Sequence, residues 1–249
     1  MNAIVEEYCK TLRLSSVLKN YSAFAKDAQK QEEGYENYLK ALLEEEVLQK
    51  EERKIKVLIN RAKFPYYKRL SEFKFEESLS INPQEILGIE PHQYINLHKN
   101  ICFLGQTGTG KTHLSIALGL DACEKGYSVA FFSAAHLVNE LIEARSALSL
   151  KRFQARLAKI DLLIIDELGY LPFSKEGAEL LFQLFADRYE KGSMIITSNL
   201  EFSKWSQFLS DSTMTSALLD RLTHHADIFT LIGESYRFKQ RKKHSLNVD

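Results

Sequence analysis

The chain has few of the residues that mark secreted, membrane-bound or metal-clustered proteins. Its three cysteines, Cys9, Cys102 and Cys123, form neither a CxxC pair nor a His-paired metal-ligand spacing. No apolar run approaches the ~18 residues of a membrane-spanning helix. Met1–Lys10 contains two glutamates and lacks the apolar segment of a signal peptide. These absences argue against a disulfide scaffold and predict a cytoplasmic protein with reduced thiols and no membrane contact.

An excess of charge of either sign is also missing. Lys+Arg and Asp+Glu are equal at 33 each, so any contact with nucleic acid must come from local basic patches. Proline is absent from residues 1–63, which contain one glycine and apolar residues at helical spacing. Pro65 then ends the helical region. We predict a helical N-terminal domain over residues 1–69, for binding DNA or a partner, and a second domain over residues 70–249.

Beyond residue 70, apolar runs of strand length alternate with helical runs. The expected strands are Ile101–Leu104, Ser128–Ser133, Leu162–Asp166, Met194–Ser198 and Ile228–Ile232. The expected helices are His113–Glu124, Ala135–Ala144, Lys151–Ala158 and Lys175–Glu190. Such alternation favours a parallel sheet covered by helices, and strands without period-2 alternation fit burial on both faces.

A phosphate-binding pattern, Gly105-x-x-x-x-Gly110-Lys111-Thr112, lies between the first expected strand and the first expected helix. Glycines let the backbone approach a phosphate, whose charge the N–H groups of a helix N-terminus stabilise. Lys111 would reach the β- and γ-phosphates, and the Thr112 hydroxyl would ligate Mg²⁺. An ordinary glycine-rich turn is the alternative, which the strand–loop–helix context disfavours. The predicted nucleotide-binding residues are Gly105, Gln106, Thr107, Gly108, Thr109, Gly110, Lys111, Thr112 and His113.

Three further signals follow the phosphate-binding loop in the chain. Asp166 and Glu167 end an apolar strand, where Asp166 would hold Mg²⁺ and Glu167 would act as general base; solvated acids are the alternative. Asn199 ends the next strand and would place the attacking water, unless it only forms a turn. Arg221 lies on a later helix, either as an arginine finger or as a surface arginine paired with Asp220.

In this order the motifs resemble an AAA+ ATPase of the DnaC/IstB group, and more closely the IstB-like transposition helper proteins. The resemblance covers most of the chain through the segments GQTGTGKTHLSIALG, IDLLIIDELGYLP, ITSNL and LLDRLTHHA. It implies an α/β fold, with an AAA+ P-loop NTPase core of five parallel strands between helices, preceded by an all-α domain. It also implies Mg²⁺-dependent ATP hydrolysis, homo-oligomers that depend on ATP and DNA, duplex DNA binding with little sequence preference, and a partner transposase.

The resemblance also assigns roles to individual positions. Its catalytic residues would be Lys111, Asp166, Glu167, Asn199 and Arg221. Thr112 and Asp166 would bind Mg²⁺, Asn199 would be sensor 1, Arg221 would act on a neighbouring subunit, and Arg237 would be sensor 2. Few residues follow the last expected strand, fewer than the usual helical lid requires. Two alternatives remain: a DnaC-like replicative helicase loader and a nucleotide-gated DNA-architectural protein.

Two basic regions are candidates for DNA contact. Solvated helix faces are the alternative, and for the aromatic and basic stretch around Lys68 the alternative is a linker that packs onto the next domain. The first lies between the second and third expected strands, where initiator-type AAA+ proteins have an extra helix facing DNA. The second precedes and crosses the predicted domain boundary. The candidate residues are Arg145, Lys151, Arg152, Arg156, Lys54, Arg61, Lys63, Lys68 and Arg69. His224 and His225 are interpreted as structural, since neighbours on a helix point to different faces and no third metal ligand is evident nearby.

Overall fold

The computed structural model describes residues 3–77, 80–209, 211–233 and 235–236. The chain divides into two compact units, residues 1–57 and 58–249. Arg237, the predicted sensor 2, lies outside the described residues. No helix of the described part is both long and apolar enough to cross a membrane.

The first unit is helical, as the scarcity of helix-breaking residues predicts. It comprises α1 (Ala3–Thr11), α2 (Ser15–Lys30) and most of α3 (Tyr35–Ala62). The Glu46 carboxylate of α3 accepts hydrogen bonds from the backbone N–H groups of Ser16 at 2.7 Å and Val17 at 3.0 Å. It thereby satisfies N–H groups in the first turn of α2, which lack helical partners. Burial raises the pKa of Glu46, but these hydrogen bonds and nearby cations outweigh it and lower the pKa overall.

The second unit begins earlier in the chain than the predicted boundary near residue 70. The end of α3 places Ala62 in the core of this unit, with Phe64 beside it. The Phe64 ring packs so closely on Gly119 that a Cβ at Gly119 would lie 2.9 Å from it. The apolar residues at the end of the long helix therefore belong to the second unit.

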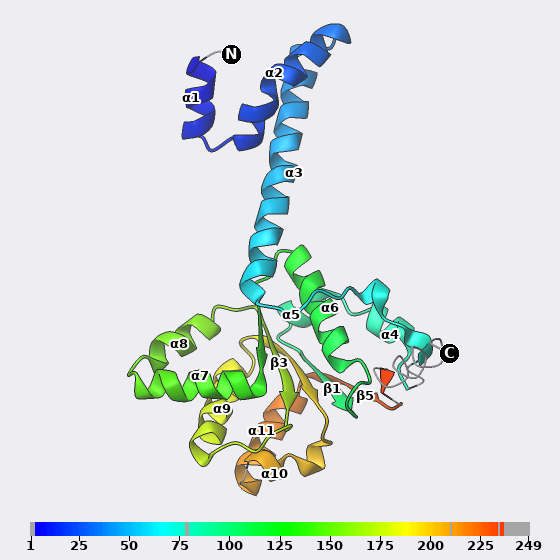
Figure 1. The fold of residues 1–249 in the computed structure, drawn as a ribbon, viewed down its shortest axis with the longest axis vertical. Coiled ribbons are helices and arrows are strands. Elements are labelled where there is room, and N and C mark those ends of the chain that lie inside the picture. The colour runs from blue at the N-terminus through cyan, green and yellow to red at the C-terminus, as the bar shows by residue number, and fades with distance from the viewer. Residues whose placement is uncertain (1–2, 78–79, 210, 234, 237–249) are drawn as a thin grey trace, which may run out of the picture. The chain divides into compact units, whose positions relative to one another are not determined.

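A five-stranded parallel sheet forms the centre of the second unit, as predicted (Figure 1). Its strands are β1 (Asn100–Gly105), β2 (Val129–Ser133), β3 (Leu162–Leu168), β4 (Ser193–Ser198) and β5 (Ala226–Leu231). They lie in the order β2-β3-β4-β1-β5. Successive side chains of β1 alternate between two cores, with Ile101 and Phe103 in one and Cys102 and Leu104 in the other. The centre of the sheet is therefore buried on both faces, whereas most of the edge strand β5 is partly or fully exposed.

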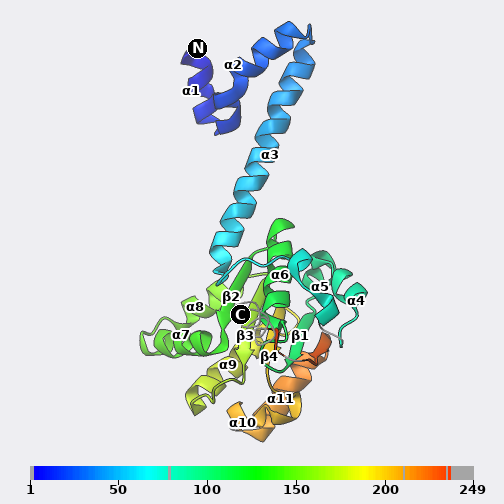
Figure 2. The ribbon, with the colours of Figure 1, turned by 45° about the vertical axis from the view of Figure 1, so that its right-hand side comes forward.

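Helices cover both faces of the sheet (Figures 1 and 2). One face packs against α4 (Pro83–Leu87), α5 (Pro91–Asn96) and α6 (Lys111–Glu124). The other packs against α7 (Ala134–Ser146), α8 (Leu150–Leu157), α9 (Lys175–Arg188), α10 (Ser206–Leu209) and α11 (Ser212–Thr223). Three short 3₁₀ turns are η1 (Leu70–Glu72), η2 (Phe75–Glu77) and η3 (Phe202–Lys204). Because all strands are parallel, their carboxyl ends meet at one edge, where α/β sheets bind ligands.

Candidate functional site

The glycine-rich loop joins β1 to α6 and leaves the start of that helix open. Gly110 is the N-cap of α6 with φ of 101°, and a Cβ there would lie 2.5 Å from the Phe73 ring. Gly108 has φ of 84° and lies against Ser235. Glycine is thus required at both positions by backbone conformation and by close packing. Since Gly110 has no side chain to cap α6, the first N–H groups of the helix are available to an anion.

Lys111 and Thr112 begin α6 and point toward groups at the strand ends. The Lys111 ammonium, on a residue only 8% exposed, donates hydrogen bonds to the carbonyl oxygens of Gly105 and Gln106, both at 2.7 Å. The Thr112 hydroxyl donates to the Asp166 carboxylate, at 3.0 Å from Oδ1 and 3.1 Å from Oδ2. The predicted phosphate-binding lysine and the two predicted Mg²⁺ residues are therefore within one cluster.

Asp166 is a buried carboxylate held by hydroxyl groups from two other elements. Besides Thr112 of α6, the Thr197 hydroxyl of β4 donates to Asp166 Oδ1 at 2.5 Å. Burial raises the pKa of Asp166, while the hydrogen bonds from Thr197 and Thr112 lower it without cancelling the effect. Hydroxyl and carboxylate oxygens are the hard ligands that Mg²⁺ prefers, so Thr112 and Asp166 fit the ion.

Glu167 leaves the regular strand at a bulge. The pairing of β3 with β4 shifts register between Ile165 and Leu168, and Glu167 has a left-handed φ of 60°. Its backbone N–H donates to the Thr197 hydroxyl at 2.9 Å instead of to the strand ladder. The bulge returns Leu168 to the core and exposes Glu167 to the cavity described below. A non-glycine residue in this conformation stores strain, which is typical of functional sites.

Thr197 is a site residue that sequence analysis missed. It is fully buried and contacts both acids, one through its carboxylate and the other through its backbone. The available signal was a hydroxyl near the end of the strand that directly precedes Asn199. Asn199 itself lines the cavity, and its Oδ1 is buried without a hydrogen-bond partner among the described residues. A buried acceptor of this kind is suited to a water or an Mg²⁺-bound water.

These residues surround a cavity of about 590 Å³. The lining residues form two groups. The first wall is the glycine-rich loop together with Glu167, Thr197 and Asn199. The second, the aromatic wall, is aromatic and basic; it comprises Tyr66, Lys68, Phe73, Lys74, Tyr170 and Tyr236. His113 joins the two walls, with its Nε2 at 2.9 Å from the Arg69 carbonyl and its ring edge-on to Phe73 at 5.3 Å.

Sequence analysis placed Lys68 and Arg69 among the candidate DNA contacts and did not foresee that this stretch lines a cavity. Lys68 lines the cavity and pairs with Glu72 at 2.9 Å. Arg69 pairs with Glu124 at 2.8 Å. The interleaved aromatic and basic residues were a visible signal, but their position beside the glycine-rich loop was not.

Arg221 lies outside the cavity of its own chain. It is on α11 with its guanidinium carbon 5.2 Å from the centroid of the Phe182 ring. Its Nη1 is buried without a hydrogen-bond partner among the described residues. Of the five predicted catalytic residues, Lys111, Glu167 and Asn199 line the cavity, and Asp166 contacts its lining residues Thr112 and Thr197. Arg221 does not line it.

The predicted DNA-contacting residues fall on different surfaces. On α8, Phe153 and Leu157 are buried, which leaves Lys151, Arg152 and Arg156 exposed. Arg156 stacks on Phe153 at 4.7 Å and lies 3.4 Å from Glu140. The remaining candidates are also exposed; they are Arg145, which pairs with Glu176 at 3.6 Å, and Lys54, Arg61 and Lys63.

A glycine-rich loop before α6, an adjoining Asp-Glu pair and a polar residue at the end of β4 define a P-loop nucleoside-triphosphate-binding protein. A profile of the family described as IstB-like ATP binding protein matches residues 7–244, and the chain belongs to this family. One relative, from Geobacillus stearothermophilus, is named as an ATP-binding protein of insertion sequence IS5376. It is 39% identical over 242 residues, which cover 97% of this chain and 96% of that protein.

Solved structures place the fold in the AAA+ class. AMPPCP-bound DnaA from Aquifex aeolicus is similar with a TM-score of 0.56 and 23% identity, covering 74% of this chain and 56% of that one. The DnaC helicase loader is similar with a TM-score of 0.50 and 22% identity, and the match covers 71% of this chain and 99% of that one. The predicted AAA+ core and the predicted DnaC/IstB grouping are confirmed.

We expect Asp166→Asn to stabilise the protein without nucleotide or Mg²⁺. Because burial raises the pKa of Asp166, the ionised carboxylate costs stability above the folded pKa, and this cost disappears on protonation. The variant should melt a few degrees higher at pH 7, and the difference should shrink as the pH approaches 3.8, the ordinary aspartate value. Thermal unfolding at several pH values measures this, and an unchanged or lower Tm at pH 7 contradicts it.

Proposed function

We propose that this protein is an ATPase of a mobile insertion sequence. ATP binding would assemble subunits on duplex DNA with little sequence preference, and hydrolysis would regulate delivery of that DNA to a transposase. The observation that supports hydrolysis most directly is the arrangement of Lys111, Glu167 and Asn199 around one cavity, with Asp166 hydrogen-bonded at its floor. The insertion-sequence name of the relative supports the biological setting.

Each residue of the cavity has a role that follows from its position. The N–H groups of the loop and the Lys111 ammonium would hold the phosphates, while the aromatic wall of Tyr66, Phe73 and Tyr236 would pack against the base. Thr112 and Asp166 would hold Mg²⁺, which neutralises charge on the phosphates when bound.

The bulge at Glu167 supports its role as general base. The carboxylate is exposed in the cavity, whereas its backbone is fixed by Thr197. Asn199 lines the same cavity, and its Oδ1, which has no hydrogen-bond partner in the described part of the chain, would orient the attacking water. Two groups that hold one water provide the orientation that hydrolysis requires.

The position of Arg221 supports assembly into oligomers. An arginine that does not line its own cavity can act only on the nucleotide of another subunit, unless the chain rearranges. Arg221 is partly exposed, and its Nη1 has no hydrogen-bond partner among the described residues, so this guanidinium is not fully engaged within its own chain. We therefore propose that Arg221 completes the site of a neighbour as an arginine finger.

The exposed cations of α8 support binding of DNA through phosphates. Phe153 and Leu157 anchor the helix, so Lys151 and Arg152 are presented on a fixed surface. Cations on a rigid element suit backbone contacts, which position a protein on DNA without reading sequence.

The first unit offers a surface for a protein partner. Three apolar residues recur along α3 at helical spacing and are about half exposed, namely Leu39, Leu43 and Val47. An apolar stripe of this kind is typical of a helix that contacts another protein. We propose that this surface meets the transposase or another subunit.

Glu167→Gln should bind ATP normally but lose at least about a hundredfold in turnover, because the amide cannot accept the proton of water. Glu179→Gln, at an exposed position of α9, is the matched control. ATP affinity and steady-state phosphate release measure the two effects. Wild-type turnover by Glu167→Gln would refute its assignment as base.

Arg221→Ala should lower turnover by about 10³-fold or more while ATP binding persists. Alone, both Arg221→Ala and Glu167→Gln should be nearly inactive. Mixed, they should regain activity, because sites with an intact Glu167 then meet a neighbour with an intact Arg221. A mixture no more active than its components would show that Arg221 does not act between subunits.

Lys151→Gln combined with Arg152→Gln should weaken binding to unrelated DNA duplexes to a similar extent. The slope of log K against log[salt] should become shallower by about 0.9 for each phosphate contact removed. Lys125→Gln with Lys204→Gln, at exposed positions elsewhere in the second unit, is the control. Equal affinity and equal slope in both double variants would exclude α8 from the DNA surface.

A further inference from the structure

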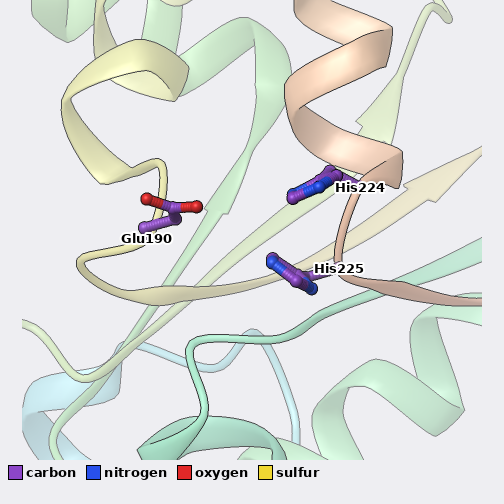
Figure 3. A group of neighbouring side chains, drawn as sticks. All are labelled: Glu190, His224 and His225. Atoms are coloured by element: carbon purple, nitrogen blue, oxygen red, sulfur yellow. The ribbon is translucent and has the colours of Figure 1, made fainter.

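Three potential metal ligands meet at the end of the sheet where α9 and α11 finish. The side chains of Glu190, His224 and His225 each offer a ligand atom, and these atoms lie within 4.8 Å of one another. Figure 3 shows Glu190 in the turn after α9, across from the two imidazole rings that follow α11. All three residues are exposed, so an ion in solution can reach them.

The structure shows a third potential ligand beside His224 and His225, which sequence analysis did not find. The two histidines follow α11, which ends at Thr223, and precede β5. Their ring centroids are 4.1 Å apart. Glu190 supplies the third ligand from a segment distant in sequence.

The backbone around these side chains is fixed by independent contacts. Arg188, only 3% exposed, donates hydrogen bonds to the carbonyl oxygens of Leu157 and Ser193, both at 2.9 Å, and so holds the end of α9. The carbonyl of His225 accepts a hydrogen bond from the backbone N–H of Asn100 at 2.7 Å. Little rearrangement is therefore needed at the main chain to bring the ligands around an ion.

Tyr189, at the end of α9, contacts His224. Its hydroxyl lies 3.1 Å from His224 Nδ1. Metal-binding histidines typically use one ring nitrogen for the ion and the other for such an orienting contact.

We propose that Glu190, His224 and His225 bind a divalent transition metal, with Zn²⁺ as the preferred ion. Two imidazoles and a carboxylate form a three-ligand set that suits tetrahedral Zn²⁺, with the fourth position open to water or to a group from another molecule. The ion would join the end of α9 to the end of α11, the helix on which Arg221 lies. This site is separate from the nucleotide cavity, since none of its ligands lines that cavity.

Calorimetric titration of the chelator-treated full chain with Zn²⁺, without nucleotide, tests the site. An Asp166→Asn background removes the carboxylate of the predicted Mg²⁺ site. We expect one equivalent to bind. Loss of a residue that only orients a metal ligand typically weakens metal binding by roughly 10- to 100-fold. His225→Ala and Glu190→Gln each remove a ligand, so each should weaken Zn²⁺ binding by more than this. Tyr189→Phe removes only an orienting contact and should weaken Zn²⁺ binding by roughly tenfold.

His136→Ala is the matched control, because His136 is an exposed histidine 2.9 Å from the Glu140 carboxylate that belongs to no three-ligand group of the described residues. It should bind Zn²⁺ as the parent does. Thermal unfolding without metal verifies that each variant folds, and Co²⁺ substitution should give visible absorption that only Glu190→Gln and His225→Ala abolish. Equal losses in His136→Ala, or unchanged binding in His225→Ala and Glu190→Gln, would show adventitious surface binding and overturn the site.

Discussion

The hydrogen bonds that converge on the buried Asp166 carboxylate are the interaction on which the site depends. They join three elements, since Asp166 belongs to β3, Thr112 to the first turn of α6 and Thr197 to β4. A parallel sheet brings these elements to one edge, and burial there makes the ionised carboxylate costly. The site thus combines the groups suited to Mg²⁺ with a cost in stability, as is common where function opposes the best packing.

One bulge separates the roles of two adjacent acids. In a regular strand Asp166 and Glu167 would point to opposite faces of the sheet, and one would enter a hydrophobic core. The register shift beyond Ile165 lets Leu168 fill that core and leaves Glu167 in the cavity. The strain of the left-handed residue is offset by the contact of its N–H with Thr197.

The two walls of the cavity differ in how the chain builds them. The first wall comes from the ends of β1, β3 and β4, whereas the aromatic wall comes mostly from segments before β1 and after β5, with Tyr170 following β3. Phe73 lies against Gly110 so closely that the loop and this wall depend on each other. The residues that lead from the end of α3 to the aromatic wall pack on the same hydrophobic core as α6 and β1. This packing explains why the second unit begins at Leu58.

Local sequence determined the strands, the glycine-rich loop and the Asp-Glu pair, because apolar runs and glycine requirements are properties of short segments. It therefore predicted a parallel sheet covered by helices, the placement of Lys111, Thr112 and Glu167, and the presence of Asn199 directly after β4, while the resemblance of the motifs implied the AAA+ fold. Only the tertiary structure decided that Thr197 bridges the acids, that Lys68 lines the cavity, and that Glu190 faces His224 and His225. These relations join segments far apart in the chain, and no periodicity or spacing within one segment records them.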